Sequence, residues 1–284
     1  MRWRGLWKHS CRNGERMITL DDRTLRNLQL TELELLKEAD RICRKNHIHY
    51  NIIAGTLLGA VRHGGFIPWD DDADIAMLRS EYDRFVEACA RDLDHSRFYF
   101  QDHRTTPGYR WGYGKLRRKD TLFLREHQEH MPYEQGIFLD VFPLDAVHNN
   151  YLLRCVDQFR CFCLRKALYA RVGKTADRNR FKRGIYRMLD RIPEDALKRR
   201  LDRMILHAPE HSDYVRILMF PTPNRTYAYR RKWYEASRDT MFEGRVFPGI
   251  AEYDEYLRFK YGNYWALPPE EERKVHPVSA LKLP

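Results

Sequence analysis

The stretch Ile67-Pro-Trp-Asp-Asp-Asp-Ala-Asp-Ile-Ala-Met77 places four carboxylates within five positions, directly before apolar residues typical of a buried strand. Side chains alternate between the two faces of a strand, so we expect Asp70, Asp72 and Asp74 to share one face. Asp71 is then expected to point away. Negative charge beside apolar sequence is costly unless a cation neutralises it. Hard oxygen ligands, with no cysteine nearby, favour Mg²⁺ or Mn²⁺ over zinc.

The composition is that of a folded, basic protein. The 284 residues fit one large domain or two modest ones, and 43% hydrophobic with 13% aromatic residues argue against disorder. The 51 Lys and Arg against 40 Asp and Glu give a net charge of +11. Such an excess suits an anionic partner, which can be nucleic acid, a phosphorylated substrate or an acidic membrane surface.

The cysteines and the first residues bear on the location of the protein. The six cysteines are scattered without the spacing of a zinc site, so we expect reduced, buried thiols in a cytoplasmic protein. No stretch reaches the length of a transmembrane helix. The start, Met1-Arg-Trp-Arg-Gly-Leu-Trp-Lys8, lacks the apolar core of a signal peptide. It predicts either a disordered tail or peripheral contact with the anionic inner face of the plasma membrane.

Hydrophobic periodicity predicts an α+β fold, with a mixed sheet, flanking helices and a helical insertion. The capping box Thr31-Glu-Leu-Glu34 predicts the start of a helix that ends near Asn46. Alternating Ile48, Tyr50 and Ile52 predict a strand that runs into Gly55. Further strands are expected at 98–100, 114–117, 121–124 and 136–142, with short ones in 221–248, and helices at 57–61, 80–93, 151–208 and Tyr253–Tyr261.

These elements divide the chain into four segments. Residues 1–20 are expected to form a basic tail, and 21–150 the catalytic core. Residues 151–215 are interpreted as a helical insertion, with Pro193-Glu-Asp opening its last helix. The segment 216–284 is expected to complete the catalytic domain.

Three separate pieces of sequence can form one phosphoryl-transfer site. Gly55 and Thr56 follow a strand and precede a helical turn, where backbone amides can hold a phosphate. Asp72 and Asp74 supply two carboxylates, and Asp140 is a single acid in an otherwise apolar strand. A buried, isolated aspartate needs a partner. A metal ion shared by these three acids would provide one.

Such a cradle for one or two Mg²⁺ ions suits phosphoryl-type transfer, because the metals neutralise phosphate oxygens and orient an incoming hydroxyl. Asp140 is our candidate for accepting the proton of that hydroxyl, and Asp70 is a candidate additional metal ligand. Cations must also face the phosphates. The candidate substrate-binding cations are Arg62, His63, Lys115, Arg117 and Arg118.

Each piece also has an ordinary structural interpretation. An Asp-x-Asp at a strand edge is as often a solvated turn as a metal site, and Asp140 can simply cap the turn Pro143-Leu-Asp145. His63 is more often a surface or packing residue than a catalyst. Residues 115–119 can be a solvated basic face. The joint occurrence of the pieces, in this order, favours a catalytic metal site.

The acidic stretch and the residues before it closely resemble the signature of the LicD family, which includes bacterial phosphocholine transferases and eukaryotic fukutin-type transferases. The resemblance lies in Gly55-Thr-Leu-Leu-Gly-Ala-Val-Arg-His63 and Gly65-Phe-Ile-Pro-Trp-Asp-Asp-Asp-Ala-Asp-Ile75. It continues at Phe138-Leu-Asp-Val-Phe-Pro-Leu144 and at Tyr256-Leu-Arg-Phe-Lys-Tyr-Gly262. Ala73 is one departure, since the family more often has Ile or Val there.

The resemblance implies a nucleotidyltransferase-like fold whose site contains Gly55, Thr56, Asp72, Asp74 and Asp140. Family members transfer phosphocholine, ribitol phosphate or glycerol phosphate from a CDP-linked donor to a sugar hydroxyl and release CMP. We therefore expect a transferase dependent on Mg²⁺ or Mn²⁺. Its acceptor is expected to be a cell-surface glycan such as lipopolysaccharide or teichoic acid, or a lipid-linked precursor.

Two other functions fit the same residues. A nucleotidyltransferase acting on a small molecule or on RNA would use the same metal cradle, but it would release pyrophosphate instead of CMP. A non-catalytic RNA-binding protein would follow phosphates with the Arg-rich helices of 151–208. No recognised RNA-binding motif supports the second alternative, so no nucleic-acid partner is expected.

Overall fold

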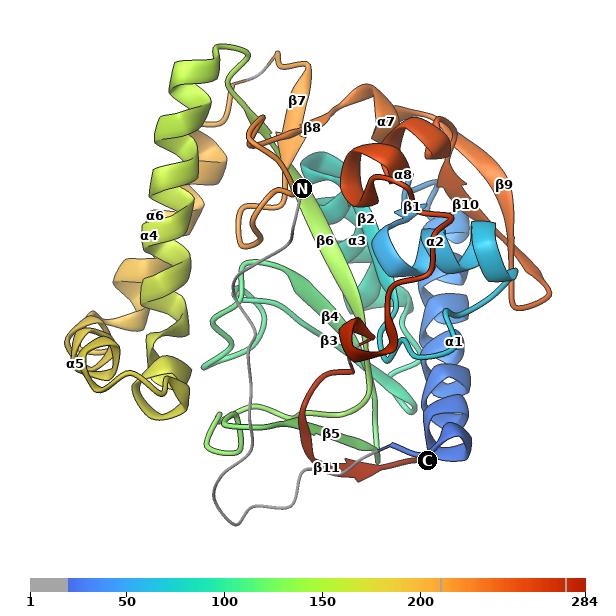
Figure 1. Cartoon of the computed structure of the whole chain (residues 1–284), viewed down its shortest axis with the longest axis horizontal. Coiled ribbons are helices and arrows are strands. Elements are labelled where there is room, and N and C mark those ends of the chain that lie inside the picture. The colour runs from blue at the N-terminus through green and yellow to red at the C-terminus, as the bar shows by residue number, and fades with distance from the viewer. Residues whose placement is uncertain (1–19, 210, 274) are drawn as a thin grey trace.

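A mixed β-sheet forms the centre of the molecule (Figure 1). The computed structural model describes residues 20–209, 211–273 and 275–284. The strands of the sheet are, in spatial order, β3 (Phe98–Gln101), β4 (Gly114–Arg118), β6 (Phe138–Val147), β2 (Asp74–Leu78), β1 (Asn51–Ile52), β10 (Arg245–Ile250) and β9 (Ser237–Phe242). The far end of β6 pairs with β7 (Tyr214–Arg216), and β7 pairs with β8 (Tyr229–Arg230). A separate two-stranded sheet joins β5 (Leu122–Arg125) to β11 (Val278–Lys282).

The register of the three neighbouring strands β4, β6 and β2 decides which residues meet. β2 and β6 run parallel, and they pair Asp74 with Asp140 and Ile75 with Val141. β4 runs antiparallel to β6 and pairs Lys115 with Asp140. A cation and two acids therefore lie side by side across three strands.

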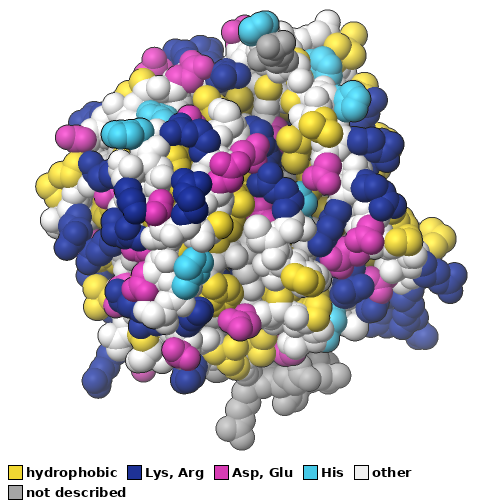
Figure 2. Space-filling model, turned by 180° about the vertical axis from the view of Figure 1, so that it is seen from behind, with side chains coloured by type: hydrophobic (Ala, Val, Ile, Leu, Met, Phe, Trp, Pro, Cys, Tyr) yellow, Lys and Arg dark blue, Asp and Glu magenta, His cyan; other side chains and the backbone are white. Residues whose placement is uncertain are grey.

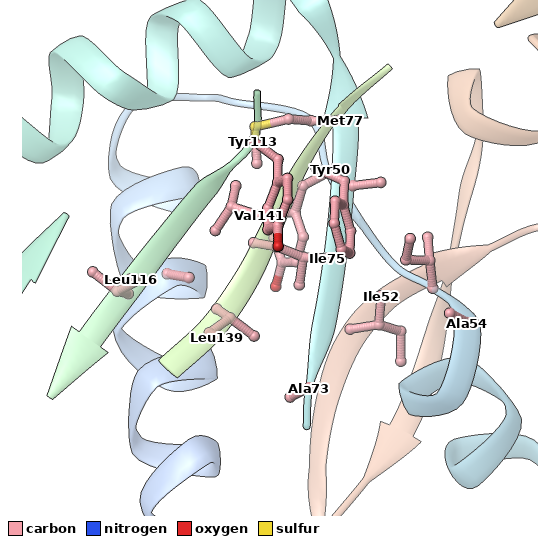
Figure 3. Close-up of a cluster of buried hydrophobic side chains, with 14 of the residues drawn as sticks. Tyr50, Ile52, Ala54, Ala73, Ile75, Met77, Tyr113, Leu116, Leu139 and Val141 are labelled. Carbon is pink, nitrogen blue, oxygen red and sulfur yellow. The ribbon is translucent and has the colours of Figure 1, made fainter. Parts of the chain in front are cut away.

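The opposite face of the same strands is apolar. Figure 3 shows side chains of this cluster, which are at most 1% exposed: Ile75, Met77, Leu116, Leu139 and Val141. Because successive residues of a strand alternate between its faces, Asp74 and Asp140 project from the other side. Burial of the apolar side chains thus fixes which way the acids face.

Helices pack around this sheet. α1 (Asp22–Lys45) contacts β4 and β6, and α3 (Arg79–Asp92) contacts β2 and β6. α2 (Ala54–His63) packs against β2, β9 and α8 (Tyr253–Tyr261). Two short helices complete the chain outside the insertion, α7 (Lys232–Glu235) and η1 (Glu270–Glu272). The predicted α+β class, with a mixed sheet and flanking helices, is confirmed.

The insertion forms a separate group of helices at one side of the sheet (Figure 1). It contains α4 (Tyr151–Ala176), α5 (Arg180–Leu189) and α6 (Glu194–Leu206), with α4 in contact with the other two. α6 begins directly after Pro193, as predicted. The domain boundaries drawn from the sequence stay predictions, and the predicted tail lies outside the described residues except for Leu20.

The predicted start of the first helix is wrong. α1 begins at Asp22, where the carboxylate of Asp21 accepts a hydrogen bond from the amide of Thr24. Thr31 lies inside the helix, and its hydroxyl donates to the carbonyl of Asn27. The apolar period continues upstream of the apparent capping box, so burial of that earlier turn extends the helix. The predicted end near Asn46 is confirmed.

The expectation that the whole acidic stretch lies in a strand is also wrong. β2 begins only at Asp74, and residues 70–73 are irregular. The amide of Asp70 donates to the carbonyl of Ile67 across a tight turn, and Gln29 donates to the carbonyls of both residues. These bonds hold the backbone away from the sheet, so the rule of alternating faces applies only from Asp74 onward.

The remaining predicted elements are mostly present. The strands expected at 98–100, 114–117, 121–124 and 136–142 correspond to β3, β4, β5 and β6, and α8 has its predicted bounds. α2 is longer than the predicted turn at 57–61, and β7 and β11 were not predicted. In the described parts of the chain, every helix is too short or too polar to cross a lipid bilayer.

Candidate active site

Three carboxylates from two neighbouring segments meet at one end of the sheet. One oxygen each of Asp72, Asp74 and Asp140 lies within 4.8 Å of the others. The amide of Asp140 donates to the carbonyl of Ala73 at 2.9 Å, which ties β6 to the residue between the other two acids. The acids that the sequence predicted to share a site are therefore together in space.

The three acids repel one another at close range. Burial raises the pKa of Asp74 well above its usual value, and the charges of Asp72 and Asp140 raise it further. Burial also raises the pKa of Asp72, although nearby His276 acts in the opposite direction. A group of oxygen ligands with this excess of negative charge fits a hard divalent cation such as Mg²⁺ or Mn²⁺.

Lys115 is the direct partner of one of these acids. Its ammonium group donates a hydrogen bond to Asp140, and both side chains are 5% exposed. Burial lowers the pKa of Lys115 to about 7, although the charge of Asp140 acts in the opposite direction. The predicted basic strand thus places its first cation in the acidic group itself.

The segment Gly55-Thr56 lies at the start of α2, beside the acids. The hydroxyl oxygen of Thr56 accepts a hydrogen bond from the amide of Asp74 at 2.7 Å. A Cβ atom on Gly55 would lie 2.4 Å from a carboxylate oxygen of Asp70. The glycine is therefore needed for the close approach of Asp70. Ala54, just before it, has a φ of 48°, and its amide donates to the hydroxyl of Tyr256.

Residues 47–156 match a family model described as "LicD/FKTN/FKRP, nucleotidyltransferase domain". The chain contains a LicD-family domain. The matched range runs from just before β1 into α4, and it holds the three acids, Lys115 and Gly55-Thr56.

Curated relatives extend this match. The lipopolysaccharide cholinephosphotransferase LicD of Haemophilus influenzae is 29% identical over 260 residues, which cover 90% of this chain and 96% of that protein. Uncharacterized proteins of Rickettsia typhi and Rickettsia prowazekii are each 40% identical, over 78 and 70 residues. Those two matches cover 25% and 26% of the rickettsial proteins. The predicted family and enzyme class, a LicD-type phosphotransferase, are confirmed.

Other residues predicted for the LicD site lie outside the group of three acids. Asp70 packs against Gly55, as described above, and its role as an additional ligand stays a prediction. Arg62 lies about 9 Å from Thr56 along the axis of α2. Its guanidinium donates to the carbonyl of Tyr264 and to the ring of His63. The substrate-binding roles of Arg62 and His63 stay predictions.

The second predicted cation of β4 has other partners. Arg117 donates to the side chain of Gln101 and to the carbonyl of Gly136. Its neighbour Arg118 donates to the carbonyls of Arg97 and Lys119. These bonds occupy guanidinium donors that a substrate would otherwise use, and the predicted roles of both arginines stay untested.

Two residues beside the acids were missed by sequence reasoning. Arg125, at the end of β5, feels the charges of Asp140, Asp72 and Asp71. In the described part of the chain, its buried Nε has no hydrogen-bond partner. His276 reaches the site from the C-terminal segment, where its ring lies 3.0 Å from Asp71 and its amide donates to the same carboxylate. Asp71 is therefore the direct partner of His276, whose ring also lies 3.8 Å from a carboxylate oxygen of Asp72.

A third missed residue is Glu32, a fully buried acid on α1. Neither of its carboxylate oxygens has a hydrogen-bond partner among residues 20–209, 211–273 and 275–284. Burial raises the pKa of Glu32 well above its usual value, and the charges of Asp72 and its acidic neighbours raise it further. Glu32 occupies a core position of a helix, so the periodic pattern alone gives no sign of this environment.

Asp140→Asn is expected to destabilise the protein in the presence of EDTA by about 3–5 kcal/mol, because it leaves the buried Lys115 without its anionic partner. Asp72→Asn removes a negative charge without isolating a cation, so it is expected to cost much less. Urea unfolding of both variants measures the difference. The double variant Lys115→Met, Asp140→Asn should recover most of the loss. Equal midpoints for the two single variants would contradict the assigned pairing.

Glu32→Gln is expected to stabilise the protein increasingly as the pH rises above about 4.5, the ordinary value for glutamate. Above that pH the unfolded chain releases the proton that folded Glu32 retains, so the free energy of unfolding of the wild type falls. Thermal unfolding in EDTA between pH 4 and pH 8 measures the effect. Glu87→Gln, on the exposed face of α3, is the matched control. A Glu32 variant less stable than the wild type at pH 8 would refute the assignment.

Proposed function

We propose that this LicD-type enzyme transfers phosphocholine from a CDP-linked donor to a sugar hydroxyl of lipopolysaccharide or another cell-surface glycan. The observation that carries the proposal is the group Asp72, Asp74 and Asp140, formed within a LicD-family domain. The choice of phosphocholine and lipopolysaccharide is supported by the name of the Haemophilus influenzae relative, 96% of which is matched by this chain. Ribitol phosphate and glycerol phosphate, as well as a teichoic acid acceptor, remain alternatives within the proposal.

A divalent cation, Mg²⁺ or Mn²⁺, is part of the proposal. Asp72, Asp74 and Asp140 would hold it, since their oxygens are close together and lack enough cations to balance them. When bound, the ion supplies positive charge to the phosphate oxygens of the donor and to the leaving group.

The reaction forms one bond and breaks one. The sugar oxygen bonds to the phosphorus that carries choline, the pyrophosphate linkage breaks, and CMP leaves with the electron pair. The proton of the sugar hydroxyl passes to a base, for which we propose Asp140. Lys115 donates a hydrogen bond to that carboxylate and so holds it in position.

Two further groups fit a phosphate of the donor. The guanidinium of Arg125 lies within the field of Asp140 and Asp72, and its unpaired Nε can donate to a phosphate oxygen. The start of α2 at Gly55-Thr56 presents backbone amides, which favour an anion at a helix N-terminus. Thr56 of α2 is hydrogen-bonded to the amide of Asp74, and Arg125 is near enough to feel the charges of Asp140 and Asp72.

The location proposed is the cytoplasm, with peripheral contact at the inner face of the plasma membrane. In support, the cysteines of the described residues are all unpaired, as is usual in a reducing compartment. The alternative of a nucleotidyltransferase keeps the same site and differs in its product, pyrophosphate instead of CMP.

The test is product analysis with CDP-choline, CDP-ribitol or CDP-glycerol, each with Mg²⁺ and lipopolysaccharide. We expect CMP from CDP-choline and phosphocholine on the glycan, measured by chromatography and mass spectrometry, and no product with EDTA. Asp74→Asn should lower the rate roughly a thousandfold, because a metal site contributes several kcal/mol to the transition state.

Asp239→Asn is the matched control, since it removes the same charge from an exposed position on β9 and should leave the rate unchanged. Release of pyrophosphate from a nucleoside triphosphate would favour the nucleotidyltransferase. Absence of CMP with all three donors, from folded protein with acceptor and Mg²⁺, would contradict the proposal.

A further inference from the structure

The positive charge of the chain is concentrated in the helical insertion. Residues 151–206 contain 16 Lys and Arg against 6 Asp and Glu, a net of +10 out of +11 for the whole chain. The other residues are almost balanced, with 35 basic against 34 acidic side chains. The proposed active site lies in that balanced part. The basic surface of the insertion therefore needs an explanation of its own.

α5 combines this charge with an exposed apolar face. Phe181, Ile185 and Met188, spaced by four and three residues, are 77%, 39% and 61% exposed. Tyr186 is buried and packs against Tyr169 of α4, so the apolar face points away from the rest of the insertion. The basic residues of this helix are Arg180, Lys182, Arg183 and Arg187, and the helix contains no acidic residue.

α4 continues the pattern. Leu152, Val156 and Phe159 recur at helical spacing and are 72%, 44% and 67% exposed. The buried residues Cys161, Leu164 and Leu168 lie on the opposite side of the helix. Figure 1 shows α5 at the outer corner of the insertion, and Figure 2 shows apolar side chains beside many Lys and Arg at the corresponding edge.

We propose that the apolar face of α5, with its flanking Lys and Arg, binds the surface of an anionic phospholipid bilayer. An interfacial helix places its apolar face at the boundary between headgroups and acyl chains, while long basic side chains reach the lipid phosphates. In this arrangement the exposed apolar residues of α5 contact the acyl chains, and its basic residues contact the lipid phosphates.

Charge argues against a second copy of this chain as the occupant, and the exposed apolar residues argue against RNA. A symmetric dimer through this face would bring two surfaces of net +10 together, and like charges oppose such contact. RNA would satisfy the arginines, but it would leave Phe181 and Met188 without partners unless bases stacked on them. The proposal that α5 binds a bilayer rests on the proposed function in one respect only, the purpose of that binding. The purpose is to bring the enzyme to an acceptor at a membrane.

The test is co-sedimentation of the full chain with vesicles. We expect binding to vesicles containing about 30% phosphatidylglycerol, weak binding to pure phosphatidylcholine, and loss of binding in high salt. The double variant Phe181→Ser, Met188→Ser should bind about tenfold or more weakly, since it removes apolar surface that enters the bilayer. Both positions are exposed, so its thermal unfolding should match that of the wild type.

The matched control is Met241→Ser, Val246→Ser, which removes two exposed apolar residues from β9 and β10 and should bind like the wild type. If the α5 variant binds vesicles as well as the wild type, the proposal is overturned. The contact with lipid then lies in another part of the chain, such as residues 1–8. Two other results would also overturn the proposal. One is a dimer of the wild type that the α5 variant no longer forms, and the other is RNA binding that the α5 variant weakens as much as it weakens vesicle binding. CMP release is also measured with the acceptor solubilised in detergent, where no bilayer is present. This assay tests the proposed transferase activity separately from membrane binding.

Discussion

The parallel register of β2 and β6 is the constraint on which the site depends, because it sets Asp74 directly beside Asp140. The same register pairs Ile75 with Val141, both fully buried on the other face. A slip of one residue would carry the acids into the core and the apolar side chains to the site. Hydrophobic burial thus holds two carboxylates together against their mutual repulsion. Lys115, paired with Asp140 from β4, offsets part of that repulsion.

Sequence patterns predicted the parts of this arrangement that depend on local periodicity or on family signature. A run of apolar residues predicted β6, with Asp140 as its single acid, and the acidic stretch predicted Asp72 and Asp74 as the other two members of the site. The turn before β2 was missed because bonds from Gln29, far away in sequence, stabilise it. His276 was missed for the same reason, since only the return of the C-terminal segment along β5 brings it to Asp71.

The chain separates its charges. Acids gather at the end of the central sheet, whereas a net of +10 lies on the insertion. The proposed donor carries a diphosphate, and a site for it cannot stay strongly negative. The proposal therefore includes a divalent cation at the acids, together with Lys115 and Arg125. The insertion has only 6 acidic residues against 16 basic ones, so it carries an excess of positive charge that can act on a surface outside the protein. In this account the catalytic core carries out the transfer, and the helical insertion binds the membrane.

The central claim is that Asp72, Asp74 and Asp140 together hold a divalent cation. Anomalous diffraction from crystals soaked in Mn²⁺ tests it most directly, because the signal identifies the metal and its ligands at once. The account predicts an anomalous peak about 2.2 Å from an oxygen of each of these three carboxylates, and its loss in Asp74→Asn. Peaks elsewhere, with none between these acids in well-ordered crystals at millimolar Mn²⁺, would contradict it.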